Sequence, residues 1–215
     1  MKQNTIRTDH IVIGSGIAGL TAALKLANSG SVILLTKKKA EDSATNLAQG
    51  GIAAALKKDD QIIWHYRDTI QVGAGLCKKN AVKILVEEGV ERVKDLIARG
   101  VNFDKYRDSE ISFTKEGGHS KRRILHSGDS TGAEIERVLL KEAKSHKNIV
   151  IKENIPVLEL LVKDQVCYGV LAEQQGPYIF LSKDVFIAAG GATHVYLQST
   201  HPFVCTGDGI AMAYR

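Results

Sequence analysis

Three glycines near the N-terminus have the spacing that lets a backbone bind a phosphate group. They form the run Gly14-x-Gly16-x-x-Gly19, which follows a short apolar segment at 10–13 and opens a helical pattern. In such a turn the first glycine permits the bend, the second lets the backbone approach a diphosphate, and the third lets the helix pack closely on the strand. The free N–H groups of the helix N-terminus attract the phosphate charge. The spacing therefore favours dinucleotide binding over a purely structural glycine turn.

Dinucleotide-binding folds usually carry an acidic residue about 20 positions further on, where it binds a ribose hydroxyl. This sequence has Thr36-Lys37-Lys38 at that place, and the first carboxylate beyond it is Glu41. The lysines weaken an assignment to NAD and are suited to the 2′-phosphate of NADP. NADP and FAD both stay open on these residues alone.

The elements around the glycines predict a βαβ unit. An apolar strand at 10–13, a helix that ends near Asn28-Ser29-Gly30 and a second apolar strand at 31–36 follow one another within 40 residues. A connection of this kind joins parallel strands. We therefore predict an α/β fold, Rossmann-like, with a parallel sheet and flanking helices.

The rest of the chain extends this fold. Apolar spacing predicts helices over 80–100 and 131–146. Short strand patterns follow at 149–151, 156–163, 166–173, 178–181 and 184–189. The middle three are joined by brief polar turns, so we expect a small antiparallel β-meander beside the parallel sheet.

Composition excludes several other classes of protein. The chain has 215 residues, of which 44% are hydrophobic and 25% charged, and these shares are typical of globular proteins. No apolar stretch approaches the roughly 18 residues that span a bilayer, and the N-terminus is polar, so we expect a soluble, cytoplasmic protein without a membrane partner. The three cysteines form no C-x-x-C pair, which predicts neither disulfides nor a metal site. The net charge of +5 comes from scattered lysines and does not favour nucleic acid as a partner.

Four motifs, in order along the chain, resemble those of a flavoprotein family. The segment 44–54, with its Ala-Gln-Gly-Gly-Ile core, resembles the flavin-contacting segment of the fumarate reductase and succinate dehydrogenase flavoproteins. Within that superfamily, the segment 116–126 (EGGHSKRRILH) resembles the signature of the L-aspartate oxidases. The segments 188–192 (AAGGA) and 206–213 (TGDGIAMA) complete the set.

This resemblance implies FAD as the cofactor and a role for each matched position. The residues Ser15 to Ala18 would surround the diphosphate, Lys37 would lie near the adenosine ribose, and Val157 would offer its backbone to the adenine. Asp208 would contact FAD and cap the helix that it begins. The segment Ala44 to Gly51 would lie along the flavin ring. The complete set of implied cofactor-binding residues is Gly14, Ser15, Gly16, Ile17, Ala18, Gly19, Lys37, Ala44, Thr45, Asn46, Leu47, Ala48, Gln49, Gly50, Gly51, Val157 and Asp208.

The resemblance also implies the reaction. L-aspartate oxidases transfer a hydride from the substrate Cα to FAD, which gives iminoaspartate for quinolinate synthase in NAD biosynthesis, and oxygen or fumarate reoxidises the flavin. Glu116 matches the glutamate that orients the substrate amine, although a solvated loop carboxylate is its alternative interpretation. For His126 we favour a simple hydrogen bond to the backbone. Arg122 and Arg123 are either surface charges or ligands of a dicarboxylate or a diphosphate.

Two departures from the superfamily matter. Relatives that attach FAD covalently do so through a histidine where this chain has Ala44, so non-covalent FAD is expected. The capping domain, with its proton-shuttling arginine, and the C-terminal helical domain have no counterpart before Arg215. We therefore expect residues 1–215 to be one incomplete FAD-binding domain of a longer enzyme. A fumarate reductase or succinate dehydrogenase type flavoprotein and a non-catalytic flavin-binding fragment are the alternatives.

Overall fold

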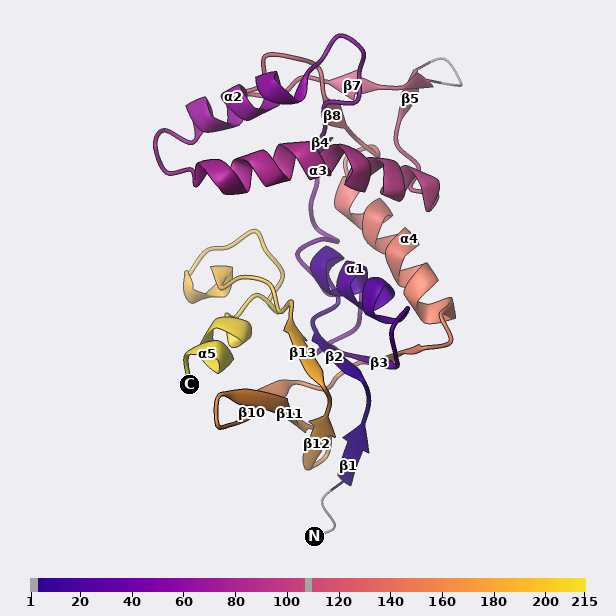
Figure 1. The fold of residues 1–215 in the computed structure, drawn as a ribbon, viewed down its shortest axis with the longest axis vertical. Coiled ribbons are helices and arrows are strands. Elements are labelled where there is room, and N and C mark those ends of the chain that lie inside the picture. The colour runs from indigo at the N-terminus through magenta and orange to yellow at the C-terminus, as the bar shows by residue number, and fades with distance from the viewer. Residues whose placement is uncertain (1–3, 107–109) are drawn as a thin grey trace. The chain divides into compact units, whose positions relative to one another are not determined.

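The computed structural model describes residues 4–106 and 110–215 (Figure 1). The chain folds into two compact units. The first unit comprises residues 1–47 and 136–215, and the second unit comprises residues 48–135. Each unit has its own sheet or sheets, and we describe each by itself.

A four-stranded parallel sheet forms the centre of the first unit. Its order is β13-β2-β3-β9, with bounds Asp184–Ile187, His10–Ile13, Val32–Leu35 and Ile149–Lys152. Helix α1 (Ile17–Leu26) connects β2 to β3. All residues of β2 and β3 are buried, as expected for parallel strands covered on both faces. The predicted βαβ unit and parallel sheet are confirmed.

A second four-stranded sheet, of order β1-β12-β11-β10, contains the predicted β-meander. The strands β10 (Val157–Lys163), β11 (Val166–Glu173) and β12 (Pro177–Leu181) pair antiparallel in succession. The sequence analysis did not predict β1 (Asn4–Arg7), which pairs parallel with β12. This pairing joins segments more than 170 residues apart, so no local pattern announces it.

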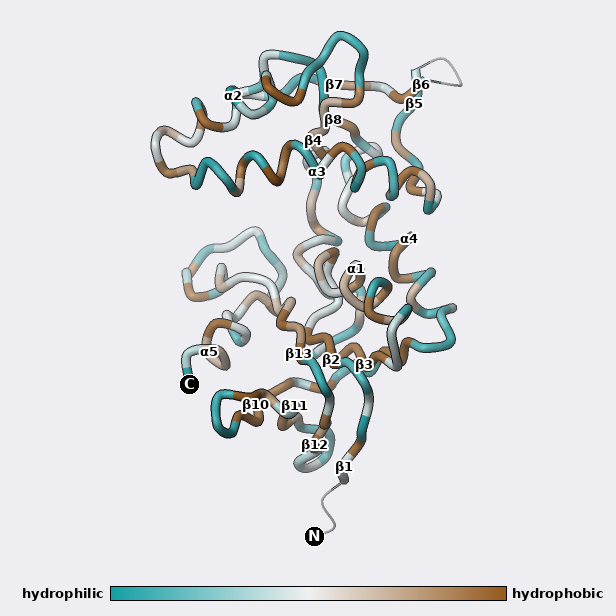
Figure 2. Tube along the Cα trace, in the orientation of Figure 1, coloured by the Kyte–Doolittle hydropathy of each residue, from teal (hydrophilic) through white to brown (hydrophobic). Residues whose placement is uncertain are grey.

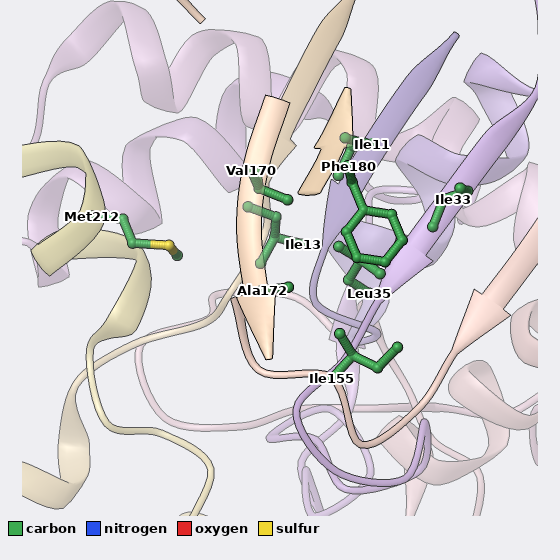
Figure 3. Packing of buried hydrophobic residues seen from close by; sticks show 9 residues of the cluster. All are labelled: Ile11, Ile13, Ile33, Leu35, Ile155, Val170, Ala172, Phe180 and Met212. Carbon is green, nitrogen blue, oxygen red and sulfur yellow. The ribbon is translucent and has the colours of Figure 1, made fainter. Parts of the chain in front are cut away.

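The two sheets of the first unit share one hydrophobic core (Figure 3). Ile11 and Leu35 come from the parallel sheet, and Val170 and Phe180 come from the meander, each fully buried. Met212, on the short helix α5 (Asp208–Tyr214), belongs to the same cluster. The strands β2 and β3 are correspondingly brown, that is hydrophobic, in Figure 2. Burial of one such large side chain stabilises the fold by about 1.5–3 kcal/mol.

The second unit combines two helices with small sheets. Helices α2 (Ile62–Val72) and α3 (Lys79–Ala98) contact each other. A three-stranded antiparallel sheet has the order β4-β8-β7, with bounds Ile52–Ala53, Ile124–Leu125 and Phe113–Thr114. The strands β5 (Lys105–Tyr106) and β6 (Glu110–Ile111) pair antiparallel. The predicted helix at 80–100 is confirmed as α3, whereas α2 was not predicted.

Two further helical segments complete the structure. Helix α4 (Thr131–Ser145) confirms the helix predicted at 131–146. A short 3-10 helix, η1 (Thr193–Val195), lies between β13 and α5.

Gly89 provides a direct test of helix α3. It lies inside the helix, and a Cβ atom added there would meet no atom within 4 Å. Glycine costs about 1 kcal/mol relative to alanine within a helix. We therefore expect Gly89→Ala to raise the free energy of unfolding by about 0.5–1 kcal/mol, measured by urea denaturation. A loss of stability would show that α3 needs the flexibility of glycine at this position.

Candidate functional site

The glycine turn after β2 brings three backbone segments together. Gly14 has a φ of +106°, a conformation that L side chains rarely adopt, and a Cβ atom there would overlap the carbonyl of Ala188. A Cβ atom on Gly19 would overlap the carbonyl oxygen of Gly14. The end of β2, the start of α1 and the end of β13 can meet only because both positions lack a side chain. Gly14 thus permits the bend after β2, and Gly19 permits the close packing of α1, as the glycine spacing predicted.

The N-terminus of α1 is open to an anion. Gly16 is its N-cap residue and has no side chain to cap the helix, and the first turn carries no acidic residue. The hydroxyl of Thr45 accepts a hydrogen bond from the N–H of Ile17, at 3.0 Å. A Cβ atom on Gly16 would lie 3.2 Å from that same hydroxyl oxygen. Free N–H groups and the positive end of the helix dipole therefore point into a space that glycine keeps empty.

A cavity of about 270 Å³ lies at this helix terminus, within the first unit. Most of the predicted cofactor residues of that unit line it, namely Gly14, Ser15, Gly16, Ile17, Ala18, Lys37, Ala44, Thr45, Val157 and Asp208. Gly19 instead packs α1 against the strand, and Asn46 and Leu47 do not line the cavity. The sequence analysis missed Asp42, Ser43, Cys205 and Met212, which also line it. The position of Asp42 and Ser43 just before the matched segment 44–54 was the available signal.

Lys37 and Asp208 form an ion pair in the cavity wall. The Nζ atom of Lys37 lies 2.5 Å from Asp208 Oδ2 and donates a second hydrogen bond to the hydroxyl of Thr206. Burial alone raises the pKa of Asp208, but the hydrogen bonds from Lys37 and Thr206 outweigh it and lower that pKa below its usual value. A carboxylate from the far end of the chain thus neutralises the lysine that stands where an acidic residue was expected.

One expectation about Asp208 is wrong. It is the first residue of α5, but Gly207 is the N-cap residue, and no side-chain hydrogen bond caps the helix. The carboxylate is instead held by Lys37 and Thr206. Its charge still lies in the first turn of α5, where the helix dipole favours it.

The remaining predicted flavin residues, Ala48 to Gly51, belong to the second unit. The carbonyl of Ala48 accepts a hydrogen bond from the N–H of Gly132. A Cβ atom on Gly51 would overlap Ile124 and would lie 2.8 Å from Nε2 of His126, whereas one on Gly50 would meet nothing within 4 Å. Gly51 therefore lets the chain pass closely beside the end of the 116–126 motif. Two motifs that the sequence separates by more than 60 residues are in contact.

Glu116 is paired rather than free. Its Oε1 atom lies 3.0 Å from Nε2 of His126, and 48% of its side chain is exposed. The interpretation of His126 as a residue that bonds the backbone alone is therefore wrong. Within the described residues, this contact uses the first carboxylate oxygen of Glu116, and no contact is found for the second.

The two arginines of the motif have different environments. Arg122 is exposed, whereas Arg123 is fully buried, so the surface-charge interpretation is wrong for Arg123. Its Nε and Nη2 atoms donate to Asp60 at 2.7 and 2.8 Å, and its Nη1 atom donates to Asp68 at 2.5 Å. The hydrogen bond to Asp60, ahead of that to Asp68, raises the pKa of Arg123. Because its donors are engaged in this network, Arg123 is not placed to bind a dicarboxylate.

Asp68 anchors the motif to α2. Besides Arg123, both the N–H and the hydroxyl of Ser120 donate to its Oδ2 atom at 2.8 Å. Burial raises the pKa of Asp68, but these donors outweigh it and lower that pKa to about 2. The loop that carries Glu116 is thus tied to α2 by ionised groups. The sequence analysis missed this function because α2 was not predicted.

Residues 4–106 and 110–215 contain no group of three His, Cys, Asp or Glu side chains that could hold a metal ion. No helix in the same two ranges is both long enough and apolar enough to cross a membrane.

We expect Gly16→Val to abolish FAD retention while the protein stays folded. The valine methyl groups would occupy the space in front of the α1 N-terminus, which a diphosphate needs. Flavin absorbance of the purified protein gives the bound FAD, and far-ultraviolet circular dichroism reports the fold. Gly89→Ala, in the open helix position of α3, is the matched control and should retain FAD. An unchanged flavin content in Gly16→Val would contradict the assignment of this cavity.

We expect Asp60→Ala to lower the free energy of unfolding by about 3–5 kcal/mol, because it leaves the buried guanidinium of Arg123 without its main partner. The neighbouring Asp59→Ala is the control. Asp59 pairs with Lys57 at an exposed position, so its removal should leave stability nearly unchanged. Chemical denaturation of the two variants beside the parent protein measures both effects, and equal small losses would contradict the importance of the buried pair.

This chain is similar to known flavoproteins in sequence and in fold. The sequence is similar to an L-aspartate oxidase of Nicotiana tabacum (44% identity over 214 residues, 96% of this chain and 33% of the relative) and to one of Clostridium acetobutylicum (43% over 211 residues, 98% and 48%). Among solved structures, Escherichia coli quinol fumarate reductase superposes with a TM-score of 0.94 at 28% identity, covering 98% of this chain and 37% of that one. The Mycobacterium smegmatis Sdh1 complex gives a TM-score of 0.89 at 29% identity, with coverages of 98% and 39%.

The chain therefore spans between a third and a half of the length of these two curated relatives. The model of the FAD binding domain family matches residues 9–215, which include the glycine turn and every strand of the parallel sheet. The space left open at Gly16, the N-terminus of α1 without an acidic residue in its first turn, and the cavity fit the diphosphate of this cofactor. FAD, rather than NADP, is the cofactor, and the chain belongs to the FAD binding domain family.

Proposed function

We propose that this chain is the FAD-binding part of an enzyme that oxidises L-aspartate to iminoaspartate. The observation that carries the proposal is the 116–126 motif, which presents a carboxylate, Glu116, held by His126 on a loop that Asp68 and Arg123 fix. The identity of 40–45% to L-aspartate oxidases over nearly all of this chain supports it. We treat residues 1–215 as one FAD-binding domain within that enzyme.

The residues that would hold FAD are those of the cavity and of the segment that follows it. The turn from Gly14 to Ala18 would bind the diphosphate through its N–H groups. Lys37 and Val157 line the same cavity and would lie along the adenosine. The segment 44–51 would lie beside the flavin ring. The methyl group of Ala44 cannot form a covalent bond to that ring. When bound, FAD supplies the redox chemistry by accepting a hydride from the substrate.

Glu116 would distinguish aspartate from a plain dicarboxylate. At neutral pH the substrate carries an ammonium group on Cα, and a carboxylate nearby favours that charge. The contact with His126 restricts the rotation of Glu116, so that one oxygen stays directed by the imidazole while the other can face the ammonium. Fumarate has no ammonium group and would gain nothing from this carboxylate.

The remaining parts of the proposal concern the whole enzyme. Oxygen or fumarate would take up the electrons, and quinolinate synthase would consume the iminoaspartate in NAD biosynthesis. We propose a cytoplasmic location, although several plant relatives are described as chloroplastic. A fumarate reductase activity is the second candidate, favoured by the superposition on Escherichia coli quinol fumarate reductase. The higher identity to the L-aspartate oxidases places it second.

The test uses the longest form of the protein that its gene encodes, loaded with FAD. Under anaerobic conditions, L-aspartate should bleach the flavin absorbance, and fumarate should restore it. Succinate is the comparison substrate, because it has the two carboxylates without the amine. Bleaching by succinate and not by aspartate would overturn the proposal in favour of the second candidate.

In the same protein we expect Glu116→Gln to raise the KM for aspartate about tenfold, equivalent to about 1.4 kcal/mol, because the amide no longer attracts the substrate ammonium. The KM for fumarate should change less than twofold, on the order of experimental scatter. Glu110→Gln, at an exposed position of β6, is the matched control and should leave both constants unchanged. Equal losses for aspartate and fumarate would contradict the amine-orienting role.

A further inference from the structure

A buried carboxyl group stands behind the wall of the FAD cavity. Glu136, on α4, is 1% exposed, and the fold and the proposed reaction have given it no role so far. Its Oε2 atom accepts a hydrogen bond from the hydroxyl of Ser43 at 2.7 Å. Its Oε1 atom is buried, and no hydrogen-bond donor in the described part of the chain reaches it. Such an oxygen is costly as part of a carboxylate and much less so when it carries a proton.

Ser43 connects this carboxyl group to the diphosphate position. Its side chain lines the cavity, and its hydroxyl oxygen would lie 4.0 Å from a Cβ atom at Gly16, the N-cap residue of α1. The same hydroxyl accepts a hydrogen bond from the N–H of Asn46, at 3.2 Å. Glu136 therefore holds the hydroxyl that orders the loop at 43–46, and this loop borders the space where the phosphates bind.

The charged groups around Glu136 are mostly negative. Glu41 and Asp42, on the loop after β3, both disfavour the ionised form of Glu136, and Asp42 also lines the cavity. Lys144 of α4 is engaged by Glu41 at 3.0 Å, and Lys37 is engaged by Asp208. Burial, followed by these two carboxylates, raises the pKa of Glu136 to about 7 against the opposing hydrogen bond from Ser43. Bound diphosphate would add further negative charge on the cavity side of Ser43.

We propose that Glu136 is a positioning residue of the FAD site that must hold a proton, at Oε1, for tight binding of the cofactor. The inference rests on FAD occupying the cavity at the α1 N-terminus. In the neutral form Glu136 keeps Ser43 in place without repelling the phosphates. As the pH rises through neutrality the proton leaves, a buried negative charge appears behind Ser43, and FAD binds more weakly. The affinity for FAD is thus linked to the uptake of one proton.

The test measures the dissociation constant of FAD for the flavin-free protein by fluorescence titration, from about pH 6 to about pH 8.5, where the protonation of Glu136 changes and that of the phosphates does not. The constant for the parent protein should rise several-fold over this range, and by no more than about tenfold per pH unit. Glu136→Gln keeps the shape of the side chain and cannot ionise, so its constant should be independent of pH. Glu88→Gln, at an exposed position of α3, is the control and should follow the parent protein.

A second variant covers the case in which Glu136→Gln does not fold. Ser43→Ala removes the hydrogen bond that favours the ionised form of Glu136, so the inflection of the pH profile should move to higher pH. A purely structural role would weaken binding at every pH without moving the inflection. Equal pH dependence in the parent protein and Glu136→Gln, or an unmoved inflection in Ser43→Ala, would overturn the role of Glu136. The assignment of the cavity to FAD would stand in either case. Failure of the parent protein to bind FAD at any pH would overturn the cavity assignment as well.

Discussion

The close approach of three backbone segments at Gly14 is the constraint on which the first unit depends. The end of β2, the first turn of α1 and the carbonyl of Ala188 after β13 meet where a single Cβ atom would cause overlap. This contact points the N-terminus of α1 along the carboxyl ends of the parallel strands, where α/β folds bind ligands. The cavity follows from it, because the loops after β2, β3 and β13 all begin at this edge of the sheet and line the cavity.

The parts of the fold encoded locally could be predicted from the sequence. Strands β2 and β3 are continuous apolar runs, and α3 and α4 carry apolar residues at helical spacing, so their patterns survive in the structure. Helix α2 was missed although it carries several apolar residues. Of its eleven residues His65 alone is buried, and Ile62, Ile63 and Val72 are exposed, so its apolar residues do not mark a face that packs into the core. Strand β1 was missed because its partner β12 lies near the other end of the chain.

The residues of the candidate site likewise fall into those that local sequence patterns identify and those that depend on contacts between distant segments. Motif spacing identified the glycine turn and most of the cavity wall, since those residues act through their backbone or their place in one short segment. It could not show that Asp208 neutralises Lys37, or which arginine of the 122–123 pair is buried, because these facts depend on contacts between distant segments. One signal was present for Glu136, which shares a helical stripe with Leu140 and Ala143, both buried.

The charges of the two units follow one rule, namely that a buried charge needs a partner. Arg123 is compensated by two carboxylates, and Lys37 by one, so each can remain ionised away from water. Glu136 has a hydroxyl donor and acidic neighbours in place of a cation, so the neutral form is the one that its surroundings favour. A site for a dianionic cofactor gains from this arrangement. The positive helix terminus faces the phosphates, while the nearest buried acid contributes no opposing charge as long as it keeps its proton.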